Sequence, residues 1–440
     1  MMEYASNAAG APESRLSNSF YLIWFGQSIS MAGSMLTAFA FGVWLFQSTG
    51  SVLNYVQLTL ASTLPGLLLL PWSGGLADRY DKRTILVACD IAALLCTAVL
   101  CMMVWRNAFS LWQLYAVQIV LSAGLAFQGP AAYATLSQIV PKEQFGRAGG
   151  MFGAASAIAQ LGAPMAAAAL LGAIGLHGII AIELVTLGIA LGGLLLANIP
   201  ATPKSEGKEP RDPVRDMKWA FQYLWQRPSM ARIFCYCAAG AFVSGVVIVL
   251  ATPMVLSAHT PGVLARVSTA GALGALLSGV LMIVWGGPRK WTPLVLAFNL
   301  VEGLAVALGG STTSVGVLCL CAFTVMLCTS TLTACMQSMW RRKVPRDRQG
   351  NFSALQQAVS MSLVPLSAVV GGLLAHNVFE PAMRPGGWLL AMVGDWFAGG
   401  PGRGTGFLFL IFGSALALLS LVSLLDRRLY SFESEVGDAI

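Results

Sequence analysis

Residues 74–83 read GGLADRYDKR, and a long apolar run lies on each side of them. Five of these ten residues are charged, in a chain of which only 10% is charged. A charged cluster between two apolar runs is typical of a turn at a membrane surface, and Lys and Arg are enriched in cytoplasmic turns. The stretch therefore predicts two membrane-spanning segments joined by a cytoplasmic loop.

The composition of the whole chain also indicates a membrane protein. Apolar residues make up 56% of the 440 residues, and the mean hydropathy is +0.72. Soluble domains carry about 25% charged residues. In lipid, backbone groups have to be paired within helices or closed barrels. Because the apolar runs are continuous and do not alternate with a period of two, the sequence predicts an all-α membrane protein.

Twelve apolar segments follow one another, six on each side of a polar, proline-broken linker at 199–216. Each is long enough for the roughly 20 residues that a membrane helix needs. We divide the chain into an N-terminal six-helix half (1–198), a cytoplasmic linker (199–231) and a C-terminal six-helix half (232–440). The predicted spans are about 18–47, 52–76, 83–105, 111–139, 148–172, 175–198, 232–257, 264–286, 291–310, 312–339, 350–377 and 404–426.

A short motif repeats between the two halves. VPKEQFGR at 140–147 lies between spans four and five, and VPRDRQGN at 344–351 lies between spans ten and eleven. The two copies are offset by 204 residues, and each has the same place in its half. The repeat predicts two pseudo-repeated halves, which is a layout found in secondary transporters.

The linker contains an amphipathic segment that starts at Asp212-Pro213. Asp suits a helix cap and Pro suits the first helical position. Apolar side chains recur at helical spacing opposite Lys218 and Gln222, namely Met217, Phe221, Leu224 and Trp225. We expect a helix on the cytoplasmic membrane surface. The alternative is that the segment forms the start of span seven.

Positive charge is distributed unevenly between the two sides of the predicted membrane. With the N-terminus in the cytoplasm, all but four of the 26 Lys and Arg fall on the cytoplasmic side; the exceptions are Arg106, Arg266, Arg384 and Arg403. Because positive residues accumulate in cytoplasmic loops, we expect both termini in the cytoplasm. This distribution explains the net charge of +7 without a nucleic-acid partner.

Motifs for enzymatic chemistry and cofactors are missing from the sequence. The nine cysteines lie within predicted spans and show no metal-binding spacing with His. The Gly-rich end of the loop between spans eleven and twelve lacks the Lys of a phosphate-binding loop. The apolar centre of that loop, 386–393, is too short to span and is expected at the membrane interface. We therefore expect neither an enzyme nor a cofactor.

The chain resembles the major facilitator superfamily over nearly its whole length. It is most similar to the bacterial branch that includes macrolide efflux proteins, the enterobactin exporter and natural-product exporters. The resemblance is carried by TGS at 49–51, the GGLADRYDKR stretch, Val140-Pro141 with Gly146-Arg147, FEP at 379–381 and GPGRG at 400–404. It implies a bacterial inner-membrane transporter with two six-helix halves.

The resemblance also implies a cytoplasmic gate motif in the first charged loop. Its residues here are Gly74, Leu76, Asp78, Arg79 and Arg83. In the family the acidic residue of this motif helps to latch the two halves together. Asp78 would then face the start of span eleven near Gln349-Gly350, where free backbone N–H groups favour an anion.

Three departures from the family pattern concern proton coupling. Gly33 is followed by Ser34, where the family often has Gly-Asp. Span four lacks an Arg that many proton-driven members carry, and span five has only Gly162-Ala163-Pro164 in place of the antiporter motif. Proton antiport is thus a hypothesis from the resemblance. The alternative is a proton-independent facilitator or a lipid- or metabolite-handling transporter.

Three carboxylates lie within predicted spans, and we consider them candidates for proton coupling: Asp90, Glu183 and Glu302. An ionisable residue inside a span is costly and is a functional candidate for that reason. Glu302 lies near mid-membrane with Asn299 one turn earlier. The alternative for Asp90 is a role in helix packing, and the alternative for Glu183 is a position at the external interface. Spans three, six, nine and twelve are peripheral in the family, which counts against Glu302 as the proton carrier.

The resemblance implies that spans one, four, seven and ten line a central cavity. Their polar and aromatic residues are uncharged, which suits a large amphipathic or neutral substrate, although such residues also join membrane helices. We therefore predict an alternating-access transporter that exports an amphipathic or hydrophobic drug or natural product, with protons and membrane lipid as its other partners. The candidate cavity residues are Gln27, Ser30, Ser34, Gln118, Ser122, Gln128, Tyr236, Ser244, Thr324, Thr329, Thr331 and Thr333.

Overall fold

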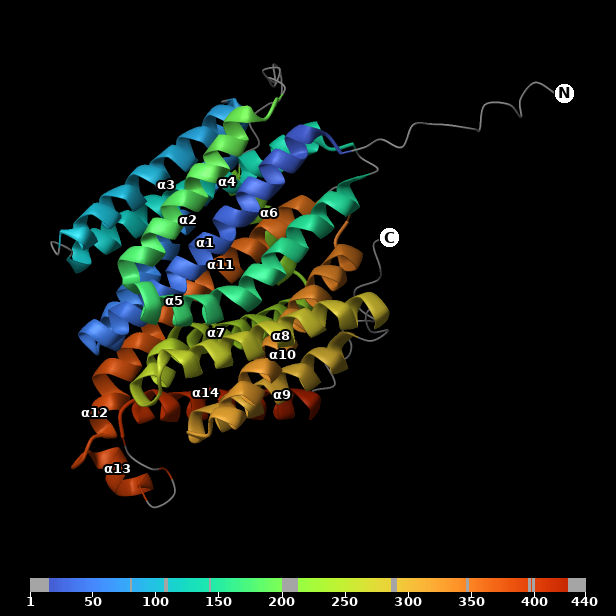
Figure 1. Ribbon diagram of the computed structural model, residues 1–440. Coiled ribbons are helices and arrows are strands. Elements are labelled where there is room, and N and C mark those ends of the chain that lie inside the picture. Colours follow the sequence, from blue (N-terminus) through green and yellow to red (C-terminus); the bar gives the residue numbers. More distant parts are fainter. Residues whose placement is uncertain are drawn as a thin grey trace.

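The structure is a computed structural model. It describes residues 16–79, 81–106, 110–141, 144–199, 213–285, 291–345, 348–394, 397 and 400–425. Eleven helices within this part of the chain are long and apolar enough to cross a membrane. One of them, Arg147–Leu196, is two crossings joined at a kink. The predicted all-α fold with twelve spans is thus confirmed (Figure 1).

Five helices form the N-terminal half, namely α1 (Asn18–Thr49), α2 (Val52–Arg79), α3 (Lys82–Trp105), α4 (Leu111–Ile139) and α5 (Phe145–Leu196). Helix α5 covers both predicted spans five and six. It is broken at Gly175, which has φ 68° and ψ −178°. Only glycine adopts this conformation readily, so Gly175 is where the chain turns back across the membrane.

The C-terminal half has six long helices, α7 (Pro228–Ala258), α8 (Pro261–Trp285), α9 (Trp291–Ser311), α10 (Val315–Lys343), α11 (Gln349–Leu374) and α14 (Arg403–Leu425). A π-helical turn, η3 (Ala375–Phe379), and α12 (Glu380–Ala382) continue α11. A short helix, α13 (Trp388–Val393), lies in the loop before α14. Its six residues are too few to span a bilayer.

Local sequence signals set several helix ends. At the start of α1, the side chain of Ser17 accepts a hydrogen bond from the N–H of Phe20 (3.2 Å), and Gly50 ends that helix with φ 61°. Asp81 in the charged stretch accepts hydrogen bonds from the N–H and the hydroxyl of Thr84, both at 3.2 Å. Such caps satisfy N–H groups that have no partner within the helix. Asp81 therefore fixes the start of α3.

Small residues bring α9 and α14 into close contact. A Cβ atom added at Gly303 would lie 2.7 Å from the carbonyl oxygen of Gly413 and 2.7 Å from the backbone nitrogen of Ala417. A Cβ atom at Gly310 would overlap the carbonyl oxygen of Gly406. In lipid, small residues allow helix backbones to approach closely. Helices α9 and α14 therefore pack tightly against each other within the C-terminal half.

The most extensive helix contacts lie within each half, with α1 against α5 in the first half and α9 against α14 in the second. Figure 1 shows the N-terminal half, blue to green, above the C-terminal half, yellow to red. The two halves meet chiefly through α5 against α8 and α2 against α11. This arrangement agrees with the predicted two-half fold.

The halves are joined at the end of the bundle where α1 finishes and α2 begins, which we call the sealed end. Here Gly372 of α11 packs on Val56 of α2, so that an added Cβ would lie 2.5 Å from Val56 Cγ2. A side-chain hydrogen bond links Tyr55 of α2 to Thr252 of α7. At the opposite end, each buried cluster in the described part of the chain contains residues of one half only.

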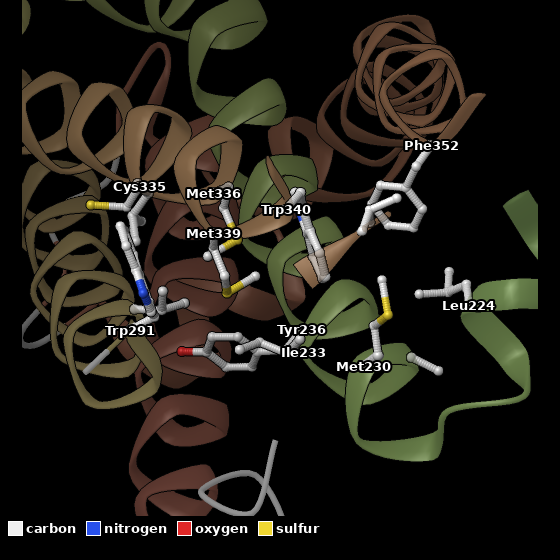
Figure 2. Packing of buried hydrophobic residues seen from close by; sticks show 14 of the residues in the cluster. Leu224, Met230, Ile233, Tyr236, Trp291, Cys335, Met336, Met339, Trp340 and Phe352 are labelled. Carbon is white, nitrogen blue, oxygen red and sulfur yellow. The ribbon is translucent and has the colours of Figure 1, made fainter. Parts of the chain in front are cut away.

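The linker helix α6 (Pro213–Trp225) is separate from α7 and packs on the C-terminal half. Ala220 and Leu224 are buried in a cluster with residues of α7, α9, α10 and α11. Figure 2 shows Leu224 in this cluster near Met230, and Trp340 beside Phe352, whose ring centroids are 5.1 Å apart. Three large apolar side chains of α6 remain at least 40% exposed, namely Met217, Phe221 and Trp225. The placement of α6 on a membrane surface stays a prediction.

Candidate substrate and proton sites

A cavity of about 120 Å³, which we call the C-terminal cavity, lies within the C-terminal half among α7, α9, α10 and α11. Much of its wall is apolar and includes Met336 and Trp340, which also belong to the buried cluster of Figure 2. The polar part of the wall consists of Ser244, Asn299, Glu302, Thr329, Thr333, Gln356 and Ser360. The predicted cavity residues Ser244, Thr329 and Thr333 therefore lie beside the predicted carboxylate Glu302.

Glu302 is the charged group in the wall of this cavity, and its side chain is only 1% exposed. Its Oε1 atom accepts hydrogen bonds from the hydroxyl of Ser244 on α7 and from the hydroxyl of Thr329 on α10, the latter at 3.1 Å. Among the described residues, no Lys or Arg is paired with it. A buried anion without a positive partner is costly, so this position favours binding of a proton or of a cationic group.

Asn299 lies one turn before Glu302 and is 2% exposed. Its Nδ2 atom donates to the carbonyl oxygen of Val295 at 3.0 Å. Helix α7 has Gly240 opposite this amide, and an added Cβ there would overlap Asn299 Oδ1. Gly240 thus allows α7 to approach α9 closely enough for Ser244 to reach Glu302.

Asp90 on α3 is 3% exposed and is held by two amides. Gln27 of α1 donates to its Oδ2 at 3.2 Å, and Gln128 of α4 donates to its Oδ1 at 2.8 Å. The predicted cavity residue Gln27 is therefore bound to a carboxylate within its own half. Each half has a buried carboxylate on its third helix, held by side chains of its first and fourth helices.

Glu183 lies in the second crossing of α5 and is 7% exposed. Its Oε1 atom accepts a hydrogen bond from the hydroxyl of Ser34 on α1 at 3.2 Å. Gly33 allows this approach, because a Cβ there would overlap the hydroxyl of Thr186 on α5. The three predicted carboxylates thus lie at three separate places, and each is bound by a predicted cavity residue.

Nine of the twelve predicted cavity residues lie outside the walls of the two described cavities, among them Tyr236 and Gln118. Tyr236 is 6% exposed in the cluster of Figure 2, and its hydroxyl is hydrogen-bonded to that of Ser420 on α14 at 2.7 Å. Gln118 is half-buried on α4. Tyr236 therefore packs against the peripheral helix α14 instead of facing the C-terminal cavity.

The gate motif is described only in part. Arg83 donates from Nη2 to the carbonyl oxygen of Leu195 at 2.7 Å, near the end of α5. This contact joins the start of α3 to the end of the sixth crossing. Outside the described part lie the side chains of Leu76, Asp78, Arg79 and Gln349, and also the surroundings of Gly74 and Gly350. The Asp78 latch stays a prediction.

A second cavity, of about 340 Å³, lies between the two halves next to the sealed end. Helices α1, α2, α5 and α7 contribute to its wall. The wall contains Phe39, Tyr55, Gln160 and Thr252, and it carries no charged residue. Apolar and aromatic walls with a few polar groups are typical of small-molecule sites. We call this space the inter-half cavity.

Some wall residues were not selected from the sequence, among them Tyr55, Gln160, Gln356 and Ser360. The prediction assigned the cavity to spans one, four, seven and ten, whereas α2, α5 and α11 also contribute. An amide within an apolar span is a recognisable signal of function, and it marks Gln160 and Gln356. Nothing in the sequence marks Tyr55, because tyrosine is common at the ends of membrane helices.

Known proteins share both the sequence pattern and the fold. The sequence matches the Major Facilitator Superfamily over residues 23–369. It is 23% identical over 366 residues to macrolide efflux protein A of Streptococcus pyogenes, covering 82% of this chain and 90% of that protein. In Enterococcus faecalis, a macrolide efflux protein A is 23% identical over 318 residues, covering 71% of this chain and 98% of that protein.

The fold is similar to that of a bacterial homolog of the human lysosomal transporter Spinster, solved in an inward-facing and unoccupied conformation. The TM-score is 0.66 at 16% identity, covering 96% of this chain and 98% of that chain. The match in sequence extends over most of the chain and the match in fold over nearly all of it. The chain is therefore a multi-pass membrane transporter, not an enzyme, and it belongs to the major facilitator superfamily.

Proposed function

We propose that this protein exports an amphipathic or hydrophobic small molecule in exchange for protons, by alternating access. The observation that carries the proposal is the environment of Glu302. Its carboxylate lies in a cavity wall, accepts hydrogen bonds from two helices and has no positive partner among the described residues. A proton and a positively polarised substrate group compete for such a carboxylate. Competition of this kind is what couples an export step to proton entry.

The substrate class follows from the cavity walls. The inter-half cavity is apolar and aromatic, and the C-terminal cavity adds hydroxyl, amide and carboxyl groups to an apolar wall. A molecule with an apolar body and a few polar groups matches the chemistry of both walls. The similarity to macrolide efflux protein A supports a large amphipathic substrate. Neither cavity wall contains a described Lys or Arg that would hold a phosphate or a carboxylate.

The contact between halves at the sealed end supports alternating access. In transporters of this kind the two halves rock about a site near mid-membrane. With both termini in the cytoplasm of a bacterial inner membrane, as the charge distribution predicts, the sealed end faces outward. The structure then corresponds to the state that opens to the cytoplasm. Asp78 would act in the opposite state, when the cytoplasmic ends of α2 and α11 approach each other.

Gly372→Leu is expected to disfavour closure of the sealed end. The added side chain would occupy the space that Val56 fills, because even a Cβ atom would lie 2.5 Å from Val56 Cγ2. Overpacking costs about 1–3 kcal/mol, which corresponds to a shift of roughly 5- to 150-fold in the balance of two states. Spin labels at Gln47 and Asn377, both exposed at this end, should report a longer distance in the variant.

The control for this variant is Gly316→Leu. Gly316 has no atom within 4 Å of an added Cβ, so the label distance should stay at the wild-type value. An unchanged distance in a folded Gly372→Leu protein would show that the contact between α2 and α11 does not govern the state of this end.

The proposed function is tested by efflux from cells that express the protein, with a panel of amphipathic dyes and antibiotics and with or without a protonophore. Efflux that the protonophore abolishes is the expected result. Efflux that persists would favour the alternative, a proton-independent facilitator, which the Gly33-Ser34 sequence also motivates. If no compound of the panel is exported by a well-expressed protein, a broad drug exporter is excluded.

A further inference from the structure

Ser34 and Ser244 occupy equivalent places in the two halves. Ser34 lies 16 residues after Asn18, the first residue of α1, and Ser244 lies 16 residues after Pro228, the first residue of α7. The two helices have 32 and 31 residues and are the first helices of their halves. Both serines therefore lie near the middle of a first helix, at similar depth.

Each of these serines donates its hydroxyl proton to a buried glutamate. Ser34 binds Glu183, and Ser244 binds Glu302. The glutamates come from helices that are not equivalent, since Glu183 lies in the sixth crossing of its half and Glu302 in the third crossing of its half. The internal repeat alone therefore does not explain why both halves contain such a pair. The two halves form the same serine–glutamate hydrogen bond with glutamates from different helices.

Ser34 is bound to Glu183 and lies on α1 beside wall residues of the inter-half cavity. The serine is exposed, whereas the glutamate behind it is 7% exposed. Met35 follows Ser34 in the chain and Ala38 lies one turn further along α1, and both are wall residues of the inter-half cavity. Residues four apart share a helix face. Ser34 is therefore an exposed residue beside this wall, and its hydroxyl reaches the buried carboxyl.

No described charge neutralises Glu183. Helix α1 contains no Lys, Arg, Asp, Glu or His, and Tyr21 is its only titratable residue. Helix α3 also packs on α5. Its Asp90 is bound by Gln27, which lies two turns of α1 from Ser34. Its Arg83 is bound to the carbonyl oxygen of Leu195. The remaining titratable groups of the packed elements are Lys82, Cys89, Cys96 and Cys101 of α3, Arg147 and His177 of α5, and Arg266 of α8.

We propose that Glu183 is a second proton-binding residue of the transport cycle, and that Ser34 is the positioning residue that connects it with the inter-half cavity. Two protons are then exchanged for each substrate, one in each half. The carboxylate takes a proton from water on one side of the membrane and returns it to water on the other side, and no other bond forms or breaks. This inference rests on the proposed proton antiport.

The first test needs no substrate. Infrared difference spectra of the purified full-length protein between low and high pH report protonated carboxyl groups by their C=O stretching bands. Glu183→Gln should remove one band of the wild-type spectrum, and Glu183→Asp should retain a shifted band. Ser34→Ala should shift the Glu183 band because it removes a hydrogen-bond donor. A Glu183→Gln spectrum identical to the wild-type spectrum would overturn the proposal.

A matched control separates this effect from a general effect on α1. Ser48 donates to the carbonyl oxygen of Leu45 within its own helix and has no role at Glu183. Ser48→Ala should leave every carboxyl band unchanged. If Ser48→Ala and Ser34→Ala cause the same shift, Ser34 does not position Glu183.

The second test counts protons in proteoliposomes, with ethidium as a permanently charged probe and the membrane potential clamped at zero. Each exchanged proton contributes a factor of about 10 in accumulation per pH unit of gradient. Wild type should accumulate ethidium about 100-fold and Glu183→Gln about 10-fold at one pH unit. Equal accumulation by both proteins would overturn the two-proton proposal alone. Lack of any gradient dependence in wild type would instead contradict the proposed antiport, while the infrared test would still decide whether Glu183 binds a proton.

Discussion

Glu302→Gln is expected to remove one exchanged proton from the transport cycle and to lower pH-driven accumulation by about 100-fold at a gradient of two pH units. Gln has nearly the same shape as Glu and keeps an oxygen that can accept the hydrogen bonds of Ser244 and Thr329. It cannot bind and release a proton. Accumulation in proteoliposomes at several imposed pH gradients measures the effect.

Two comparisons make the Glu302 result specific. Substrate counterflow, which needs no proton gradient, should continue in Glu302→Gln at saturating substrate because the cavity wall keeps its shape, although the neutral amide binds a positively polarised group more weakly. Glu302→Asp retains an ionisable carboxyl and should keep the steeper, two-proton dependence of accumulation on the pH gradient that Glu302→Gln has lost. If Glu302→Gln shows the same dependence on the gradient as wild type, Glu302 has no part in coupling.

Gly413→Leu is expected to separate α9 from α14 and to destabilise the fold by about 3 kcal/mol or more. Gly413 packs directly on the backbone of α9, where the carbonyl oxygen of Gly413 lies 2.7 Å from a Cβ added at Gly303. A leucine at this contact cannot be accommodated by a side-chain rotation, since its neighbours are backbone atoms. Inserting bulk into a tight contact costs about 1–3 kcal/mol and occasionally more. Thermal unfolding of the purified protein in detergent measures the loss.

The matched control for Gly413→Leu is Gly279→Leu. Gly279 lies on α8 and has no atom within 4 Å of an added Cβ. The same change of residue there should leave the unfolding temperature unchanged or raise it, because leucine has a higher helix propensity than glycine. Equal unfolding temperatures for the two variants would contradict the packing described for α9 and α14.

The architecture was largely predictable because it depends on patterns that are local in sequence. Hydropathy places all twelve spans, and the described helix ends differ from the predicted ends by only a few residues. Asp81 and Gly175 were not assigned as a cap and a break in advance, although both lie where the spans were divided. These signals depend on only a few neighbouring residues, so they can be recognised in the sequence alone.

The site was predictable in its charged residues and not in its contacts. Asp90, Glu183 and Glu302 are recognisable because a carboxyl group inside an apolar span is rare. Their partners are distant in sequence: Ser34 is 149 residues from Glu183, and Ser244 is 58 residues from Glu302. Which side chains meet depends on how each helix is rotated about its axis, and hydropathy is similar all around a buried helix.

Tyr236 illustrates the same difficulty. The prediction placed it in a cavity because span seven lines the cavity in the family. In the structure its hydroxyl bonds to Ser420 of α14, while Cys237, the next residue of α7, lies in the cavity wall. Successive residues of a helix point about 100° apart, so one helix contributes both to the cavity and to the contact with a peripheral helix. Assignment of a whole span to the cavity cannot separate these two faces.

The central claim is that this protein exchanges an amphipathic molecule for protons. The most direct test is the accumulation of ethidium by the wild-type protein in proteoliposomes with an acidic interior and a clamped membrane potential, measured as a function of the pH gradient. The account predicts accumulation that rises about 100-fold for each pH unit, as expected for two protons, and collapses when a protonophore is added. Protein-dependent ethidium entry that reaches the same final level at every gradient would contradict it and would identify a facilitator.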